Sequence, residues 1–139
     1  MSASIAWSGL TEFRAALRAV PADLSDQAGA IVDRHARNAA SGIRGEYQQH
    51  RVTGRLAGRV TVNIARTGLA PLSVVRSAAP HAALFEFGTQ LRRTKSGANR
   101  GSAPPHPTVI PIAQRERRAM NQDLIGLVKA AGFDVSGVL

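Results

Sequence analysis

The chain contains no cysteine. This excludes a disulfide framework, a thiolate nucleophile and cysteine-ligated zinc or iron–sulfur sites. No segment approaches the roughly 18–20 consecutive apolar residues of a membrane-spanning helix. Residues 1–10 lack the basic and apolar regions of a signal peptide. We therefore expect a soluble protein of the cytosol, with no membrane contact.

Aromatic residues are also scarce, at 4% of the chain, whereas hydrophobic residues make up 44%. The core must then be built mainly from Ala, Val, Leu and Ile. A length of 139 residues predicts a single domain, 1–139. Such a light core gains from burial against partners.

Acidic residues number 9 against 18 basic ones, which gives a formal net charge of +9. An excess of this size favours nucleic acid or an acidic protein surface as partner. A genome rich in arginine codons explains the same excess, since only Lys95 and Lys129 among the basic residues are not arginine. Both interpretations stay open.

Helical periodicity appears in three segments. Leu10, Phe13 and Leu17 predict a short helix over 9–19, which Pro21 separates from a long helix over 22–49. Small residues of the long helix, Gly42 among them, permit close packing. A third helix is expected over about 110–131, with residues 132–139 as a loose tail.

Alternating residues predict strands between the helices. Residues 59–65 and 73–77 fit an antiparallel pair, and 82–87 fit a third strand, so the sheet should occupy about 55–88. Residues 88–108 are basic and rich in Gly and Pro. We expect a loop that is disordered in the free protein and ordered on contact. The predicted class is α+β, with three to four antiparallel strands packed against two long helices.

No constellation of residues indicates catalysis. The four histidines lack partners at metal-ligand spacing, which predicts no metal and no cofactor. His35 lies on an apolar helical stripe, and His81 and His106 lie beside prolines, where packing roles fit best. Glu86 stands alone in its apolar segment, so we expect it on the polar face of a strand, paired with an arginine, rather than acting as a general base. The chain is predicted not to be an enzyme.

Basic residues form two candidate surfaces for DNA or an acidic partner. The first follows the long helix and its continuation: Arg34, Arg37, Arg44, Arg51, Arg55 and Arg59. The second is the loop cluster Arg92, Arg93, Lys95 and Arg100, together with Arg115, Arg117 and Arg118 on the next helix. Neither is interleaved with aromatic residues, which argues against base stacking. Solvated surface charge is the competing interpretation.

Three blocks stand out in order: residues 53–62 (TGRLAGRVTV), residues 81–89 (HAALFEFGT) and residues 105–113 (PHPTVIPIA). Together they resemble the small tail-component family of long-tailed bacteriophages, which includes tail-completion and head–tail connector proteins. The resemblance covers about residues 9–131. His81 and Val109 depart from it, since aromatic residues are usual at both positions.

The resemblance implies a structural virion protein at the head–tail interface, present in the host cytoplasm during assembly. It would form a homo-oligomeric ring, expected to be a hexamer, that completes the tail and joins it to the head connector or stopper. Further partners would be the tail tube or terminator proteins, with transient contact to packaged DNA. The expected interface residues are Glu86, Phe87, Gly88, Thr89, Arg92, Arg93, Lys95, Arg100, His106 and Pro107, with Glu86 meeting an arginine of the next subunit. Two alternatives remain: a tail terminator that caps the tube, and a basic DNA-associated protein without a virion role.

Overall fold

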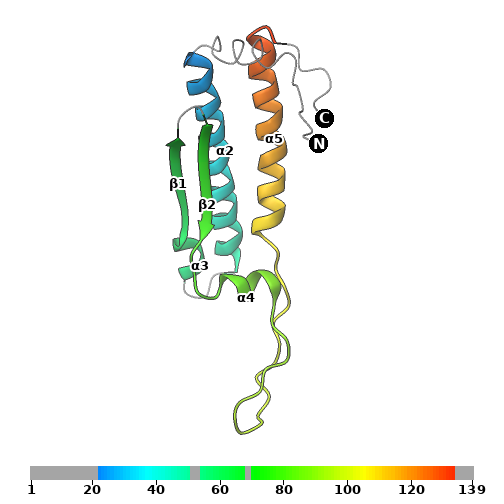
Figure 1. Ribbon diagram of the computed structural model, residues 1–139. Coiled ribbons are helices and arrows are strands. Elements are labelled where there is room, and N and C mark those ends of the chain that lie inside the picture. Colours follow the sequence, from blue (N-terminus) through cyan, green and yellow to red (C-terminus); the bar gives the residue numbers. More distant parts are fainter. Residues whose placement is uncertain (1–21, 51–53, 68–69, 134–139) are drawn as a thin grey trace, which may run out of the picture.

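Two long helices and a two-stranded sheet form the body of the protein. The computed structural model describes residues 22–50, 54–67 and 70–133. The elements run in the order α2 (Ala22–Gln49), α3 (Arg55–Gly58), β1 (Val60–Thr67), β2 (Ala70–Ser77), α4 (Ala82–Phe87) and α5 (Val109–Ala130). Helices α2 and α5 lie side by side, and the sheet lies against α2 (Figure 1). The class is therefore α+β, as the sequence predicts.

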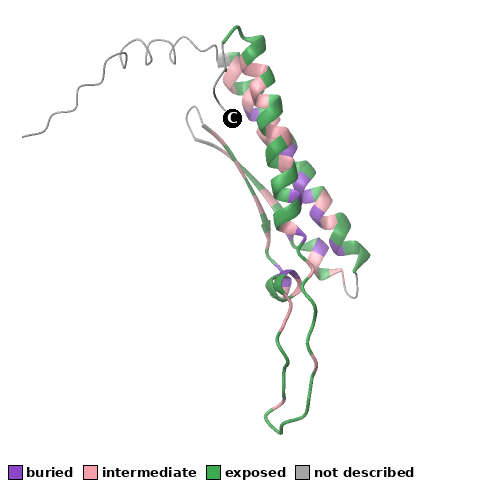
Figure 2. Ribbon diagram, turned by 90° about the vertical axis from the view of Figure 1, so that its right-hand side faces the viewer, coloured by how far each residue is buried: buried purple, intermediate pink, exposed green. Residues whose placement is uncertain are grey.

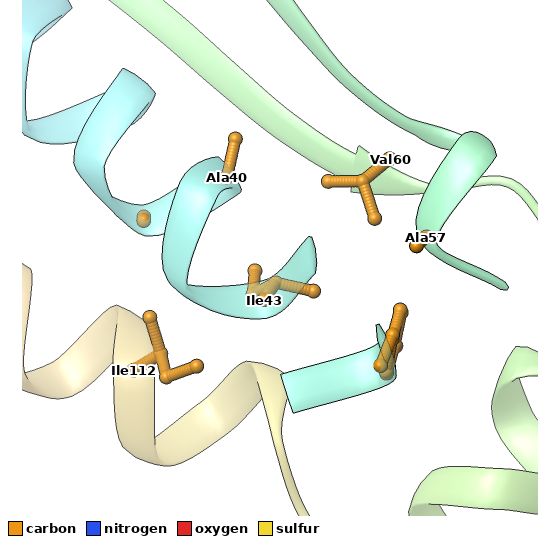
Figure 3. Packing of buried hydrophobic residues seen from close by; sticks show 7 residues of the cluster. Ala40, Ile43, Ala57, Val60 and Ile112 are labelled. Carbon is orange, nitrogen blue, oxygen red and sulfur yellow. The ribbon is translucent and has the colours of Figure 1, made fainter. Parts of the chain in front are cut away.

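The core lies between the C-terminal half of α2, helix α3, the first residue of β1 and the first turn of α5, and it contains few large side chains. Its buried members are Ala39, Ala40, Ile43 and Tyr47 of α2, Ala57 of α3, Val60 of β1 and Ile112 of α5 (Figure 3). Helices α2 and α5 approach closely at Gly42, where an added Cβ would lie 3.4 Å from Ile112 Cγ2. The small residues of α2 thus permit the close packing expected from the sequence.

Strands β1 and β2 pair antiparallel, with Val62 opposite Val75 and Asn63 opposite Val74. Residues directly opposite share a face of the sheet, and faces alternate along each strand. Val62 and Val75 pack against the core, whereas Leu72 and Val74 are exposed. One face of the sheet is therefore covered by the body and the other is open.

The structure corrects two sequence predictions about the sheet. Residues 82–87 form helix α4 instead of a third strand, and residues 55–58 form helix α3, so the described part of the chain has two strands where three to four were expected. The alternation of Leu84 and Glu86 with two phenylalanines suggested a strand, yet Ala, Leu and Glu favour helix. The helix predicted over 9–19 and the tail beyond residue 133 lie outside the described residues.

Residues 88–107 form a two-stranded arm that extends away from the body (Figures 1 and 2). Backbone hydrogen bonds join its two sides: Thr89 N–H to the Ala103 carbonyl at 2.9 Å, Arg92 N–H to Gly101 at 3.0 Å and Thr94 N–H to Ala98 at 2.9 Å. The sequence favoured disorder for this segment. The structure has instead a narrow ribbon that closes in a turn over residues 94–98.

Candidate functional site

The arm joins the body at Glu86, a buried acid of α4. Its Oε2 accepts the N–H of Thr108 at 2.7 Å, and both carboxylate oxygens lie 3.2 Å from the N–H of Val109. Its Oε1 also accepts the hydroxyl of Tyr47 at 2.9 Å. One carboxylate therefore holds together α2, α4 and the start of α5.

These contacts make Glu86 a long-range cap of α5. The first N–H groups of a helix have no intrahelical acceptors, and a negative charge there is favoured by the helix dipole. Thr108 precedes α5, but its hydroxyl donates to the His106 carbonyl and does not cap the helix. Glu86 takes that role from 22 residues away in the sequence.

The expected position of Glu86 is therefore wrong. It does not lie on the polar face of a strand, and its carboxylate is turned inward toward donors of the same chain. Only its predicted place on a strand is corrected, and its contact with an arginine of a neighbouring subunit stays a prediction.

Gly88 and Thr89 close the arm directly beyond Glu86. Gly88 has φ +72°, and an added Cβ would lie 2.7 Å from the Ala103 carbonyl oxygen, so only glycine fits. Thr89 pairs with Ala103 twice, because its Oγ1 also accepts the Ala103 N–H at 2.9 Å. The two sides of the arm are thus fixed at its base.

Aromatic and imidazole rings pack beside this base. The ring centroid of Phe85 lies 5.4 Å from that of Tyr47, in an edge-to-face arrangement. It lies 5.2 Å from the ring centroid of His106, on which Phe85 stacks. His50 contacts both Phe85 and His106. His106 also donates its backbone N–H to the Phe85 carbonyl at 2.9 Å. The packing role predicted for His106 is confirmed.

A second polar cluster joins α2 and α5 farther from the arm, at His35, Glu116 and Asp123. His35 Nδ1 lies 3.0 Å from Glu116 and its Nε2 lies 2.9 Å from Asp123. Arg34 pairs with Asp123 as well. Both ring nitrogens face carboxylates, so only the doubly protonated imidazolium can donate to both. His35 is thus buried between the helices, in the packing role predicted for it.

The charges of this cluster shift one another's titration. The hydrogen bond to Asp123, supported by Glu116 and opposed by burial, raises the pKa of His35 above its usual 6.5. The same contacts to His35 lower the pKa values of Glu116 and Asp123. The cluster thus favours its charged form.

The predicted basic residues separate into two groups. The four arm residues, Arg92, Arg93, Lys95 and Arg100, are all exposed. In the set along the long helix, Arg34 pairs with Asp123. Arg44 donates to the Val60 carbonyl at 2.8 Å. Arg51 lies outside the described residues. Arg37, Arg55 and Arg59 are exposed. The arm is the more concentrated cationic surface.

Large apolar side chains are exposed where the arm leaves the body. Phe87 is 73% exposed, and Leu84, Leu91 and Ile110 are each at least half exposed. These four residues, the apolar rim, come from α4, the first residues of the arm and the start of α5, segments that hydrogen bonds bring together. The sequence singled out Phe87 and missed the other three, although helical spacing places Leu84 and Phe87 on one face. Pro107 is also exposed there.

Comparisons with protein-family models, curated proteins and solved structures find no match for this chain. Within residues 22–50, 54–67 and 70–133, no helix is long and apolar enough to cross a bilayer. The described residues also hold no group of His, Asp and Glu side chains suited to a metal ion. We name the contacts of Glu86, Gly88 and Thr89 with residues 103–109 the anchor of the arm.

Proposed function

We propose that this chain is a structural protein of the head–tail interface of a long-tailed bacteriophage. Copies of it would form a ring that completes the tail and joins it to the head connector, without catalysis. The proposal starts from the three sequence blocks and their order.

The observation that carries the proposal is that residues of the second and third blocks contact each other at the base of the arm. Glu86 of the second block binds the backbone of Thr108 and Val109 in the third, 22 and 23 residues away. Gly88 and Thr89 close the arm between the blocks. The arm contributes no residue to the described core, although several contacts fix its base. Such a projecting segment is suited to contacts with partner proteins.

The apolar rim supports ring assembly. Exposed aromatic and aliphatic side chains on neighbouring segments are candidates for a contact surface. In a ring, each subunit buries such a surface against a different surface of the next subunit. We assign the rim, in which Phe87 is the most exposed side chain, to this contact, and the second copy of the chain would cover it.

Electron microscopy of lysates that lack this chain tests the proposal. We expect full heads and tails of normal length that are not joined, and joining should return when the wild-type chain is supplied. Joined infectious particles without the chain would contradict the proposal. Tails of irregular length would favour the alternative role as a tail terminator.

A matched pair of variants tests the rim. Phe87→Ser should fail to restore joining, because it removes an exposed contact while changing stability by less than about 0.5 kcal/mol. Val74→Ser, which removes a smaller exposed apolar side chain from the open face of the sheet, should restore it. Equal activity of both variants would remove the rim from the interface.

A further inference from the structure

The part of the arm beyond the apolar rim, residues 92–103, differs in chemistry from the rest of the surface. We name it the outer arm. It carries Arg92, Arg93, Lys95 and Arg100, all exposed, and no acidic residue occurs anywhere from Phe87 to Arg115. Among the described residues, no carboxylate forms an ion pair with any of the four. We propose that the outer arm binds the phosphate backbone of duplex DNA.

The other residues of the outer arm favour phosphates over an acidic protein. They are small or polar, with Thr94, Ser96 and Asn99 near the tip, and none is aromatic or a large aliphatic. Hydroxyl, amide and backbone N–H groups contact phosphates together with Arg and Lys. Protein interfaces are instead centred on buried aromatic or arginine anchors within apolar pockets, and the last large apolar residue before the tip is Leu91.

The shape of the outer arm favours a duplex over a single strand. Arg100 N–H donates to the Arg92 carbonyl at 2.7 Å, and Arg93 forms a bridge with Asn99, so the outer arm is a two-stranded ribbon. The major groove of B-form DNA admits such a ribbon, whereas the deep, narrow groove of A-form RNA does not. Single strands are usually held by stacking on aromatic rings, which the outer arm lacks.

The anchor presents this ribbon at a distance from the body. Glu86, Gly88 and Thr89 fix its base, and the arm then extends clear of the helices and the sheet (Figure 2). Phosphate binding by four cations carries no sequence information, so we expect binding without sequence preference. This inference does not depend on the virion role, because the isolated chain can be tested for it.

Fluorescence anisotropy with the full chain and a short mixed-sequence DNA duplex, over a series of salt concentrations, tests the proposal. The arm variant replaces Arg92, Arg93, Lys95 and Arg100 by Gln. The control variant replaces Arg76, Arg117, Arg118 and Lys129 by Gln. It removes the same charge from exposed positions of β2 and α5 outside the outer arm, including two α5 arginines that the sequence grouped with the arm. Circular dichroism should show the same helical content in all three proteins.

We expect the wild type to bind the duplex with a strong salt dependence. Each phosphate contact contributes about 1 to the slope of log affinity against log salt, so the arm variant should reduce that slope by about 4. Its affinity at low salt should fall by about 100-fold or more, while the control variant keeps the slope of the wild type. These two results together support the proposal.

Three results would overturn it. The first is no duplex binding by the wild type at low salt. The second is an equal loss in the arm and control variants, which would indicate attraction by net charge alone. The third is tighter binding to poly-glutamate or to single-stranded DNA than to the duplex, which would assign the outer arm to an acidic protein or to unpaired strands.

Discussion

Two polar clusters tie α5 to the rest of the molecule, and they differ in how they do so. At the start of α5, Glu86 is buried and its donors are two backbone N–H groups and the hydroxyl of Tyr47. Farther along, His35 is held between Glu116 and Asp123, and the Asp123 side chain is 44% exposed. The first cluster relies on neutral donors in a buried site, and the second relies on charges of which Asp123 is partly exposed.

The comparison indicates a division of roles. Burial strengthens hydrogen bonds and makes their loss costly, whereas an ion pair with an exposed partner, such as that of His35 with Asp123, is weakened by solvent. The Glu86 cluster supports the arm, so the part of the molecule assigned to partners has the stiffer attachment. The His35 cluster joins two helices that already pack through Gly42 and Ile112, and it adds a dependence on pH.

The largest effect is expected from Glu86→Ala. The substitution leaves the N–H groups of Thr108 and Val109 and the hydroxyl of Tyr47 without their acceptor in a buried place. We expect a loss of about 3 kcal/mol in the free energy of unfolding. Glu86→Gln keeps the size of the side chain and one acceptor, so it should lose less. An unchanged urea midpoint for Glu86→Ala would contradict the assigned role.

Gly88→Ala should follow, with a loss of about 2 kcal/mol. The new Cβ meets the Ala103 carbonyl oxygen at 2.7 Å and also requires a positive φ. Gly97→Ala is the matched control, because Gly97 has φ +84° but no atom within 4 Å of an added Cβ. It should cost about 1 kcal/mol at most. Equal losses for the two variants in urea denaturation would show that the close approach at the arm base has no energetic weight.

Tyr47→Phe is expected to cost about 1 kcal/mol, since it removes one hydrogen bond to Glu86 and keeps the ring packed on Phe85. The Tyr47 hydroxyl also lies 3.4 Å from Ser77 Oγ, a longer contact. Ser77→Ala should therefore change stability less than Tyr47→Phe. The reverse order in the two urea midpoints would contradict the assignment of Glu86 as the main partner of Tyr47.

The smallest effect is expected from pH, acting on the His35 cluster. The pKa of His35 is raised, so its contribution is complete below 6.5 and is lost as the pH rises through its folded value. The pKa values of Glu116 and Asp123 are lowered, so their contributions are complete above 4.5 and are lost as the pH falls through their folded values. The cluster should thus contribute most between these two pH values.

Urea denaturation across this range, for the wild type and for His35→Gln, measures the effect. The wild type should lose stability above the window more steeply than the variant. Arg34 pairs with Asp123 and Arg115 pairs with Glu116 in the same cluster. Parallel pH profiles for the two proteins would show that His35 does not titrate against these carboxylates.

The sequence predicts the parts of this fold that depend on local periodicity. The helix over 22–49, the two strands and the helix starting near Pro111 appear close to the expected positions, because each has its own stripe of apolar residues. The packing histidines were also recognisable from their neighbours. Local pattern was therefore enough to place the main elements of the body.

The anchor could not be predicted in the same way. Residues 82–87 alternate like a strand and were predicted as one, whereas they form helix α4. In that helix Glu86 contacts the start of α5 across 22 residues, which no local pattern indicates. The arm has no apolar stripe, and its order comes from backbone hydrogen bonds that no side-chain pattern records. A lone acid between two phenylalanines was a usable signal, since a buried carboxylate must find donors.

Quantitative mass spectrometry of purified particles, normalised to the portal protein, tests the central claim most directly. A structural ring at the head–tail interface predicts a ring-like copy number, far below that of the tail tube protein. Complete absence of the chain from intact particles would contradict the claim and leave a DNA-associated or assembly role outside the virion.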